Sequence, residues 1–157
     1  MAVNIRKAKL SDLSALVSMA IGLTTHECEF DPLLLPNPGK FKSDYVKYFR
    51  RHLKRKNSIA LIAKSRGRAA GYALLEVRKR PPFFRERRYL YIHDLFVPER
   101  YRRRGVGSAL INETKKIAAE RNTRVVELSA YAKNKDALRF YRSQGFRPSQ
   151  VEMRIHI

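Results

Sequence analysis

Apolar positions recur every three to four residues in four stretches of the chain, which is the spacing of one face of an α-helix. The predicted helices cover residues 13–23, 41–53, 106–120 and 136–144. In the second of these stretches Phe41, Tyr45 and Phe49 recur every four residues, and lysines and arginines occupy the other positions. Each helix therefore has one apolar face to bury, and the chain needs a second kind of element to bury it against.

Short apolar or alternating runs supply that second element, because they are typical of β-strands. The predicted strands cover residues 3–6, 58–64, 69–77, 89–97, 125–130 and 152–157. The turn at residues 65–68 contains Gly67 and predicts an antiparallel hairpin, whereas the proline-containing stretches 24–39 and 78–88 predict loops, the first with one helical turn at 33–35. This order predicts an α+β (mixed α/β) fold with a mostly antiparallel sheet flanked by helices, in one domain over residues 1–157.

Composition agrees with a single folded domain. The chain has 157 residues, 44% of them hydrophobic, which is enough to build a core and argues against disorder. Charged residues interrupt every apolar run well before the roughly 18 residues that a membrane span needs. Arg6, Lys7 and Lys9 precede an apolar stretch as in a secretory signal, but the polar side of residues 13–23 favours an amphipathic helix. Cys28 is the only cysteine, so a reducing, cytoplasmic location is expected.

Positive charge is concentrated in the later part of the chain. The 34 lysines and arginines exceed the 14 acidic residues by 20, and residues 1–46 carry no net charge. Three basic runs, at 47–56, 78–88 and 100–104, hold much of the excess. Such a field attracts polyanions such as nucleic acid or phosphorylated cofactors, although it is also compatible with an ordinary basic surface.

The stretch between the fourth strand and the third helix has the composition of an anion site. Gly105 and Gly107 let the main chain turn and approach a ligand closely, and the helix that follows presents free N–H groups. We interpret it as a phosphate cradle, with tight packing of the turn as the alternative. The spacing matches neither a Walker A loop nor a Rossmann fingerprint.

A second stretch, residues 134–146, combines with this loop into a recognisable pattern. Together they resemble the GNAT superfamily of N-acetyltransferases, over nearly the whole chain (3–155). The matching positions are Arg102, Gly105, Gly107, Asn134, Ala137, Phe140, Tyr141, Gly145 and Phe146. The resemblance implies a splayed sheet that admits acetyl-CoA and transfers its acetyl group directly to an amine.

The same resemblance assigns roles to individual residues. The main chain of Leu95, Phe96 and Val97 would pair with the pantetheine arm. The phosphates would be held by the loop residues Arg102, Arg103, Arg104, Gly105, Val106, Gly107 and Ser108. Asn134 and Ala137 would contact the cofactor arm, and Tyr141 would donate a proton or hydrogen bond to the leaving sulfur.

A general base is needed because a lysine-like amine is protonated at pH 7. Residues 91–97 resemble a strand of the diamine acetyltransferases, in which the position of His93 is a glutamate. We favour His93, or a water held by it, over Asp94, because strand alternation should let only one of the two face the site. A water relay that uses neither residue is the alternative.

The sequence identifies the amine acceptor less specifically than it identifies the cofactor. Glu27, Glu29 and Asp31 form the chain's acidic cluster, in the region that shapes the acceptor site in this family, and would select a cationic amine. A solvated loop is the alternative, and the charge of +20 favours acceptors carried on acidic molecules over free polyamines. The resemblance also implies a homodimer formed through the C-terminal strand. The histidines and Cys28 show no metal-ligand spacing, so no metal is expected.

Two other functions remain open from the sequence. A nucleic-acid-binding module is supported by the charge and by the aromatics at 83–84 and 89–91 among arginines, although no RRM, KH or zinc-finger pattern is present. A regulator that binds acyl-CoA without turnover would share the fold and the cofactor.

Overall fold

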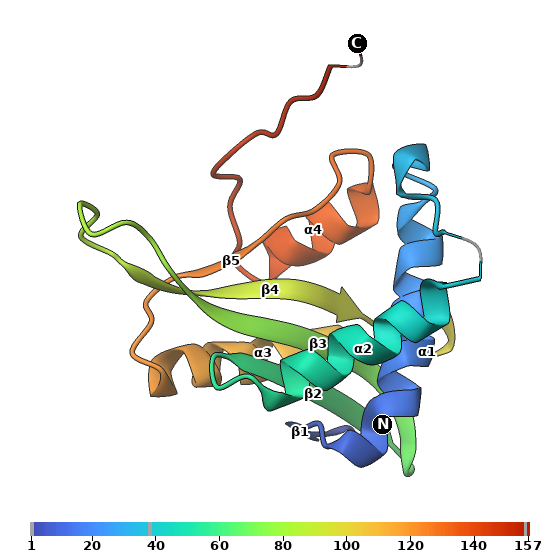
Figure 1. Cartoon of the computed structure of the whole chain (residues 1–157). Coiled ribbons are helices and arrows are strands. Elements are labelled where there is room, and N and C mark those ends of the chain that lie inside the picture. Colours follow the sequence, from blue (N-terminus) through green and yellow to red (C-terminus); the bar gives the residue numbers. More distant parts are fainter. Residues whose placement is uncertain (1, 38, 156) are drawn as a thin grey trace.

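The computed structural model describes residues 2–37, 39–155 and 157 (Figure 1). The strands are β1 (Asn4–Lys7), β2 (Ser58–Ser65), β3 (Arg68–Lys79), β4 (Arg88–Phe96) and β5 (Val126–Leu128). The α-helices are α1 (Leu13–Glu27), α2 (Phe41–Lys54), α3 (Val106–Glu120) and α4 (Lys135–Ser143). Short 3-10 turns lie at η1 (Leu10–Asp12), η2 (Pro32–Leu34) and η3 (Glu99–Tyr101).

The five strands form one sheet in the order β1-β2-β3-β4-β5. Each of the first three neighbouring pairs is antiparallel, and β4 pairs with β5 in parallel. The parallel pair is connected through α3, as a parallel pair needs a crossover. The predicted mixed, mostly antiparallel sheet flanked by helices is therefore confirmed.

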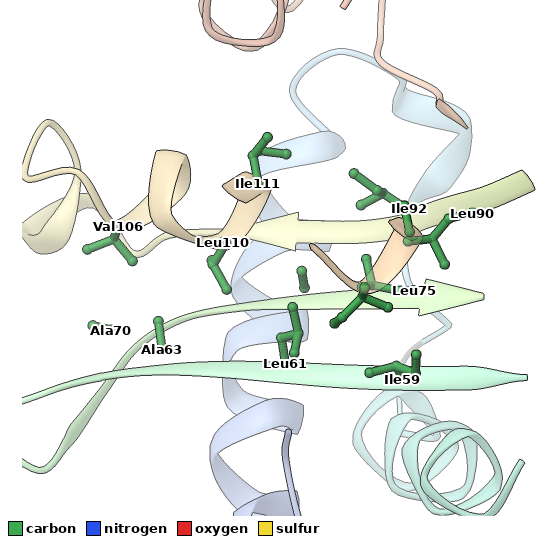
Figure 2. Packing of buried hydrophobic residues seen from close by; sticks show 13 residues of the cluster. Ile59, Leu61, Ala63, Ala70, Leu75, Leu90, Ile92, Val106, Leu110 and Ile111 are labelled. Carbon is green, nitrogen blue, oxygen red and sulfur yellow. The ribbon is translucent and has the colours of Figure 1, made fainter. Parts of the chain in front are cut away.

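Both faces of the central strands are covered, which explains why their sequences are almost continuously apolar. Along β2, Ile59, Leu61 and Ala63 pack on the face that carries α3, and the residues between them pack on the face that carries α1 and α2. Figure 2 shows the α3 side, where Leu110 points toward the strands and Ile111 points away from them, although both belong to the buried cluster. A sheet buried on both sides gives β4 a rigid frame from which to present the site.

Helix α1 ends at Glu27, four residues later than the predicted end at residue 23. Thr24 and Thr25 do not break the helix, because the Thr25 hydroxyl donates to the carbonyl of Ile21 (2.8 Å) and so satisfies its polar atom locally. The extension places Glu27 on the last turn of a helix. Glu27 therefore belongs to a helix, whereas the sequence predicted that it lies in a loop.

The predicted strand at residues 152–157 is wrong for the part that the structure describes, residues 152–155 and 157, which contain no strand; His156 lies outside the described residues. This segment points away from the sheet in Figure 1. Arg154 donates to Asp31 (2.8 Å), which holds the segment near the start of η2 and away from β5. Alternation alone does not make a strand, because a strand also needs a partner edge.

Within the part of the chain that the structure describes, no helix has the length and apolar character to span a bilayer.

Candidate functional site

A β-bulge shapes the middle of β4. Leu74 of β3 pairs with Asp94, but the next residue, Leu75, pairs with Ile92, so His93 is the extra residue. The imidazole Nε2 of His93 lies 2.8 Å from Glu76 Oε2, and the Tyr72 hydroxyl donates to Asp94 (3.1 Å). Both partners belong to the α1–α2 face of β3, so His93 and Asp94 lie on one face. A bulge therefore interrupts the alternation from which the sequence predicts that only one of them can face the site.

Beyond the bulge, the two parallel strands separate. The pairing between β4 and β5 covers only Leu90–Ile92 with Val126–Leu128, whereas β4 continues to Phe96. Leu95 and Phe96 are paired with β3 on their other edge. Their open edge, continued by Val97, can therefore accept an extended ligand in place of a strand.

The glycine loop follows the open end of β4. Gly105 has a φ of 81° and is the residue before α3, and no atom lies within 4 Å of the position its Cβ would take. The N–H groups of Val106, Gly107 and Ser108 start the helix and have no acceptor within it. Because Gly105 leaves the space before them open, they can bind an anion.

The three loop arginines are exposed and not equivalent. The Arg102 guanidinium donates to the carbonyl of Val97 (3.0 Å) and so ties the loop to the end of β4. Arg103 has a φ of 56°, and neither it nor Arg104 forms an ion pair among the described residues. Arg103 and Arg104 are therefore the mobile charges of the loop.

Helix α4 packs directly against this loop. A Cβ on Gly107 would lie 3.0 Å from the Phe140 ring, so the glycine is what lets α4 approach α3 this closely. Asn134 accepts a hydrogen bond from the N–H of Ala137 (3.0 Å) and caps α4. Its side-chain NH₂ group remains available for the predicted contact with a cofactor arm, and the capped helix fixes where Tyr141 lies.

Glu27, Asp94 and Tyr141 form the centre of an acidic–aromatic cluster. Burial, together with the negative charge of Asp94, raises the pKa of Glu27 to about 7. Burial also raises the pKa of Asp94. Burial and the charges of both carboxylates raise the pKa of Tyr141 to about 12. At neutral pH the cluster thus combines a carboxylate that exchanges its proton easily with a phenol that keeps its proton.

Tyrosines from α2 and β3 complete this cluster, and the sequence did not single them out as site residues. Tyr45 shares a short hydrogen bond with Thr24 of α1, and Tyr72 donates to Asp94. The charge of Asp94 contributes to the raised pKa of both Tyr45 and Tyr48. Tyr45 is one of the apolar positions whose spacing predicted α2. Spacing of this kind cannot distinguish a tyrosine in the core from a tyrosine that lines a site.

The three carboxylates of the predicted acidic cluster have different partners. Glu29 is exposed and lies 3.5 Å from His26. Asp31 accepts from the N–H of Leu33 and from Arg154, so its carboxylate is already paired. Of the three acidic residues, Glu27 alone has its pKa raised by the charge of Asp94.

His93 belongs to a neighbouring polar network. Besides its bond to Glu76, its ring lies edge-on to the rings of His52 and Tyr91. Arg78 donates to Glu76 (3.2 Å), and these contacts lower the pKa of Glu76. His93 is thus held by the carboxylate of Glu76 within this network. No group of three or more potential metal ligands occurs among the described residues.

A family model described as the acetyltransferase (GNAT) family matches residues 26–146 of the chain, a span that contains the bulge, the glycine loop and α4. The chain belongs to this family. The resemblance carried by the two sequence motifs is therefore confirmed.

Relatives agree with this assignment. An uncharacterized N-acetyltransferase of Methanocaldococcus jannaschii is 32% identical over 104 residues, which are 66% of this chain and 46% of that protein. An uncharacterized N-acetyltransferase of Archaeoglobus fulgidus is 33% identical over 106 residues, 68% of this chain and 71% of that protein. The match thus spans less than half of the first relative and most of the second.

Solved GNAT-like structures share the fold across the whole chain. A tetramutant protein from Bacillus halodurans superposes with a TM-score of 0.89 at 21% identity, covering 98% of this chain and 99% of that one. A predicted acetyltransferase from Clostridium acetobutylicum, solved with acetyl-CoA, gives 0.78 at 20% identity and covers 99% and 96%. The aminoglycoside acetyltransferase AAC(6')-Iy, in complex with a CoA-acetylneamine bisubstrate analogue, gives 0.79 at 16% identity and covers 100% and 99%.

Proposed function

We propose that this GNAT protein is an acetyl-CoA-dependent N-acetyltransferase that transfers an acetyl group directly to a cationic amine. The observation that carries the proposal is the arrangement of Glu27, Asp94 and Tyr141 around the open end of β4. A cation is stabilised by two nearby carboxylates and by aromatic faces, and this cluster offers both. The class of acceptor is a compound whose primary amine is protonated in water.

The residues present suit acetyl-CoA. The unpaired edge of β4 at Leu95–Val97 can pair with an extended, amide-containing arm, and the N–H groups of Val106, Gly107 and Ser108 can hold a pyrophosphate. Arg103 and Arg104 add positive charge beside them. When bound there, acetyl-CoA supplies the activated acetyl group and a thiolate leaving group.

Glu27 is the residue we propose as general base. Its pKa of about 7 lets the carboxylate take a proton from a bound ammonium and release it again near neutral pH. His93, the residue favoured from the sequence, is bound to Glu76 and has no comparable place beside Tyr141. We therefore assign His93 to positioning the bulge, and Asp94 to holding the amine.

Tyr141 is the proton donor of the proposal. Its raised pKa keeps the hydroxyl protonated, so it can donate to sulfur as negative charge develops there. The Cys28 thiol donates to the carbonyl of Leu34, and direct attack of the amine on the acetyl group needs no enzyme nucleophile.

Free CoA release from acetyl-CoA, measured against polyamines, aminoglycosides, amino acids and peptides, tests the proposal. We expect turnover on one acceptor class and a fall in kcat of at least about tenfold in Tyr141→Phe, because general acid catalysis contributes about 10²–10⁴ and water substitutes in part. Tyr101→Phe is the matched control, since its ring packs at the edge of the α3 core. CoA binding without turnover on any acceptor would instead make the protein a regulator.

We also propose that the protein forms a homodimer through residues 151–157. Val151, Met153, Ile155 and Ile157 alternate along this segment and are each at least 82% exposed, although apolar side chains of this size are normally covered. The outer edge of β5 has no strand beside it among the described residues. Pairing of this segment with β5 of a second copy would cover the segment and the edge together.

Sedimentation velocity tests the dimer. We expect the wild type to sediment as a dimer and Val151→Thr/Met153→Thr/Ile155→Thr as a monomer, because the triple change removes the apolar face but keeps strand propensity. Lys133→Thr/Arg147→Thr, two exposed positions outside the segment, should remain dimeric. A monomeric wild type would refute this part of the proposal.

A further inference from the structure

The connection between β3 and β4 is a projecting basic arm. The two strands pair out to Lys79 and Arg88, and the N–H of Arg80 donates to the carbonyl of Arg87 (2.7 Å), so the hairpin extends beyond the sheet. Figure 1 shows it reaching away from the helices. The segment 78–88 contains six basic residues and a single acidic one, Glu86, and we call it the arm.

Two phenylalanines stand at the tip of the arm. Phe83 is 79% exposed and Phe84 49%, and their ring centroids lie 4.8 Å apart. A buried core explains neither ring, because Phe83 is mostly exposed and Phe84 is about half exposed. Exposed aromatic pairs of this kind give flat faces on which other planar groups can stack.

A cationic hollow of about 650 Å³ opens at the base of the arm. Five of its lining residues are basic, and they come from the α2–β2 connection, both strands of the arm and the residue after α3: Lys56, Arg78, Lys79, Arg88 and Arg121. Segments remote in sequence thus gather like charges in one concave place, which concentrates the positive potential.

Most of this charge is not neutralised within the protein. Arg78 pairs with Glu76 and Arg80 with Glu127. In the described part of the chain no ion pair involves Lys56, Lys79, Arg85, Arg87, Arg88 or Arg121. A fold that leaves so many cations together and unpaired gains stability when an anionic partner arrives.

Aromatic and arginine planes continue from the tip toward the hollow. The Arg80 guanidinium lies 4.2 Å from the centroid of the Tyr89 ring, and Arg78 lies 3.9 Å from that of Tyr91. The arm therefore carries stacking faces at its tip and stacked Arg–Tyr pairs along its length, with the cationic hollow beside them.

We propose that the arm and the hollow bind single-stranded nucleic acid. Phosphates would lie on Lys56, Lys79, Arg88 and Arg121, and bases would stack on Phe83 and Phe84, the combination by which single strands are held without sequence readout. A flexible strand can follow a concave surface. The exposed aromatic pair at the tip favours a partner with planar bases over an anionic bilayer, which offers no bases to stack.

The arm lies at the opposite end of β4 from the glycine loop, whereas the hollow borders the His93 network through Glu76 and Arg78. The arm joins the start of β4 and the glycine loop follows its end, and the nine residues of β4 span roughly 30 Å. Nucleic acid on the arm would leave the glycine loop open, and it would bring acceptors carried on nucleic-acid-bound molecules close to the enzyme.

Fluorescence anisotropy with a labelled 20-nucleotide RNA, the DNA of the same sequence and an RNA duplex tests the proposal over a salt series. We expect both single strands to bind better than the duplex. Phe83→Ala/Phe84→Ala should weaken binding at least about tenfold, because base–aromatic stacking contributes about 1–3 kcal/mol per base. Phe83→Tyr/Phe84→Tyr should bind like the wild type.

A charge series isolates the phosphate contacts. Lys79→Gln/Arg88→Gln/Arg121→Gln should lower the slope of log K against log salt by about 2, because each contact to a single strand contributes about 0.7. Lys42→Gln/Lys47→Gln/Arg50→Gln removes the same charge from exposed positions of α2 and should change the slope little. Circular dichroism confirms folding of each variant.

Three results would overturn the proposal: unchanged affinity in Phe83→Ala/Phe84→Ala, equal losses in the two charge variants, or binding to phosphatidylserine vesicles without binding to RNA or DNA. The last result would assign the arm to a membrane surface. A preference between RNA and DNA would identify which single strand is the partner.

Discussion

Glu27→Gln is expected to lower kcat for acetyl transfer by about a hundredfold, with a smaller change in the KM for acetyl-CoA. The amide keeps the shape of the side chain and cannot accept the proton of the ammonium, and general base catalysis contributes about 10²–10⁴. The matched control is Glu29→Gln, two residues further on, where the carboxylate is exposed and pairs with His26. Its kcat should equal that of the wild type.

The pH profile gives a second readout of the same group. A base works only as the carboxylate, so kcat/KM of the wild type should rise with pH through an apparent pKa near 7, the value to which burial and Asp94 raise Glu27. This acid limb should be absent from the residual activity of Glu27→Gln. An unchanged limb in the variant would assign the base to another group, and His93→Gln would then be the next variant.

Stability should change in the opposite direction to activity. The pKa of Glu27 is about 7 in the folded protein and 4.5 as a free side chain, so the folded protein binds this proton more tightly. Ionisation therefore costs stability as pH rises from 4.5 through 7, and the cost is complete above 7. Glu27→Gln should raise Tm at pH 8 and leave it nearly unchanged at pH 4.5. A lower Tm at pH 8 would mean that the charge is stabilised in place.

The position of Glu27 shows what sequence reasoning could reach here. The acidic residues near the end of the first helix were recognised, but periodicity ended that helix at residue 23 and made the three carboxylates equivalent. In the structure the helix continues, and Glu27 lies near enough to Asp94 for that charge to raise its pKa, while Glu29 and Asp31 have other partners. Which carboxylate enters a site depends on packing between helix and sheet, which one-dimensional spacing does not contain.

The bulge at His93 is a similar case. The sequence predicts β4 from its apolar alternation, and alternation is the property that a bulge breaks. Likewise Tyr45 and Tyr72 look like core residues, because they bury most of their surface and present only a hydroxyl to the site. By contrast, the glycine loop and α4 were found from the sequence, since backbone freedom and close packing restrict which residues can stand there.

Gly107→Val is the second variant with a large expected effect. An added Cβ would lie 3.0 Å and 3.3 Å from two atoms of the Phe140 ring, and valine adds two more methyl groups. Overpacking of this kind costs about 1–3 kcal/mol, and α4 has to move to relieve it. Tyr141 is the next residue on α4, and a displacement of about 1 Å can cost about 10² in rate. We expect kcat/KM to fall about a hundredfold and Tm to drop.

The glycine at position 67 separates this effect from simple loss of glycine. Gly67 has a φ of 75° and no atom within 4 Å of its Cβ position, so Gly67→Ala strains the turn without touching α4. It should lower Tm modestly and leave kcat/KM unchanged.

Phe140→Leu should restore part of the activity of Gly107→Val, because the smaller side chain makes room for the valine. Phe140→Leu alone should destabilise the protein. If Phe140→Leu does not rescue Gly107→Val, the defect lies in the N–H groups of the loop. Full activity of Gly107→Val alone would show that α4 does not need this glycine to position Tyr141.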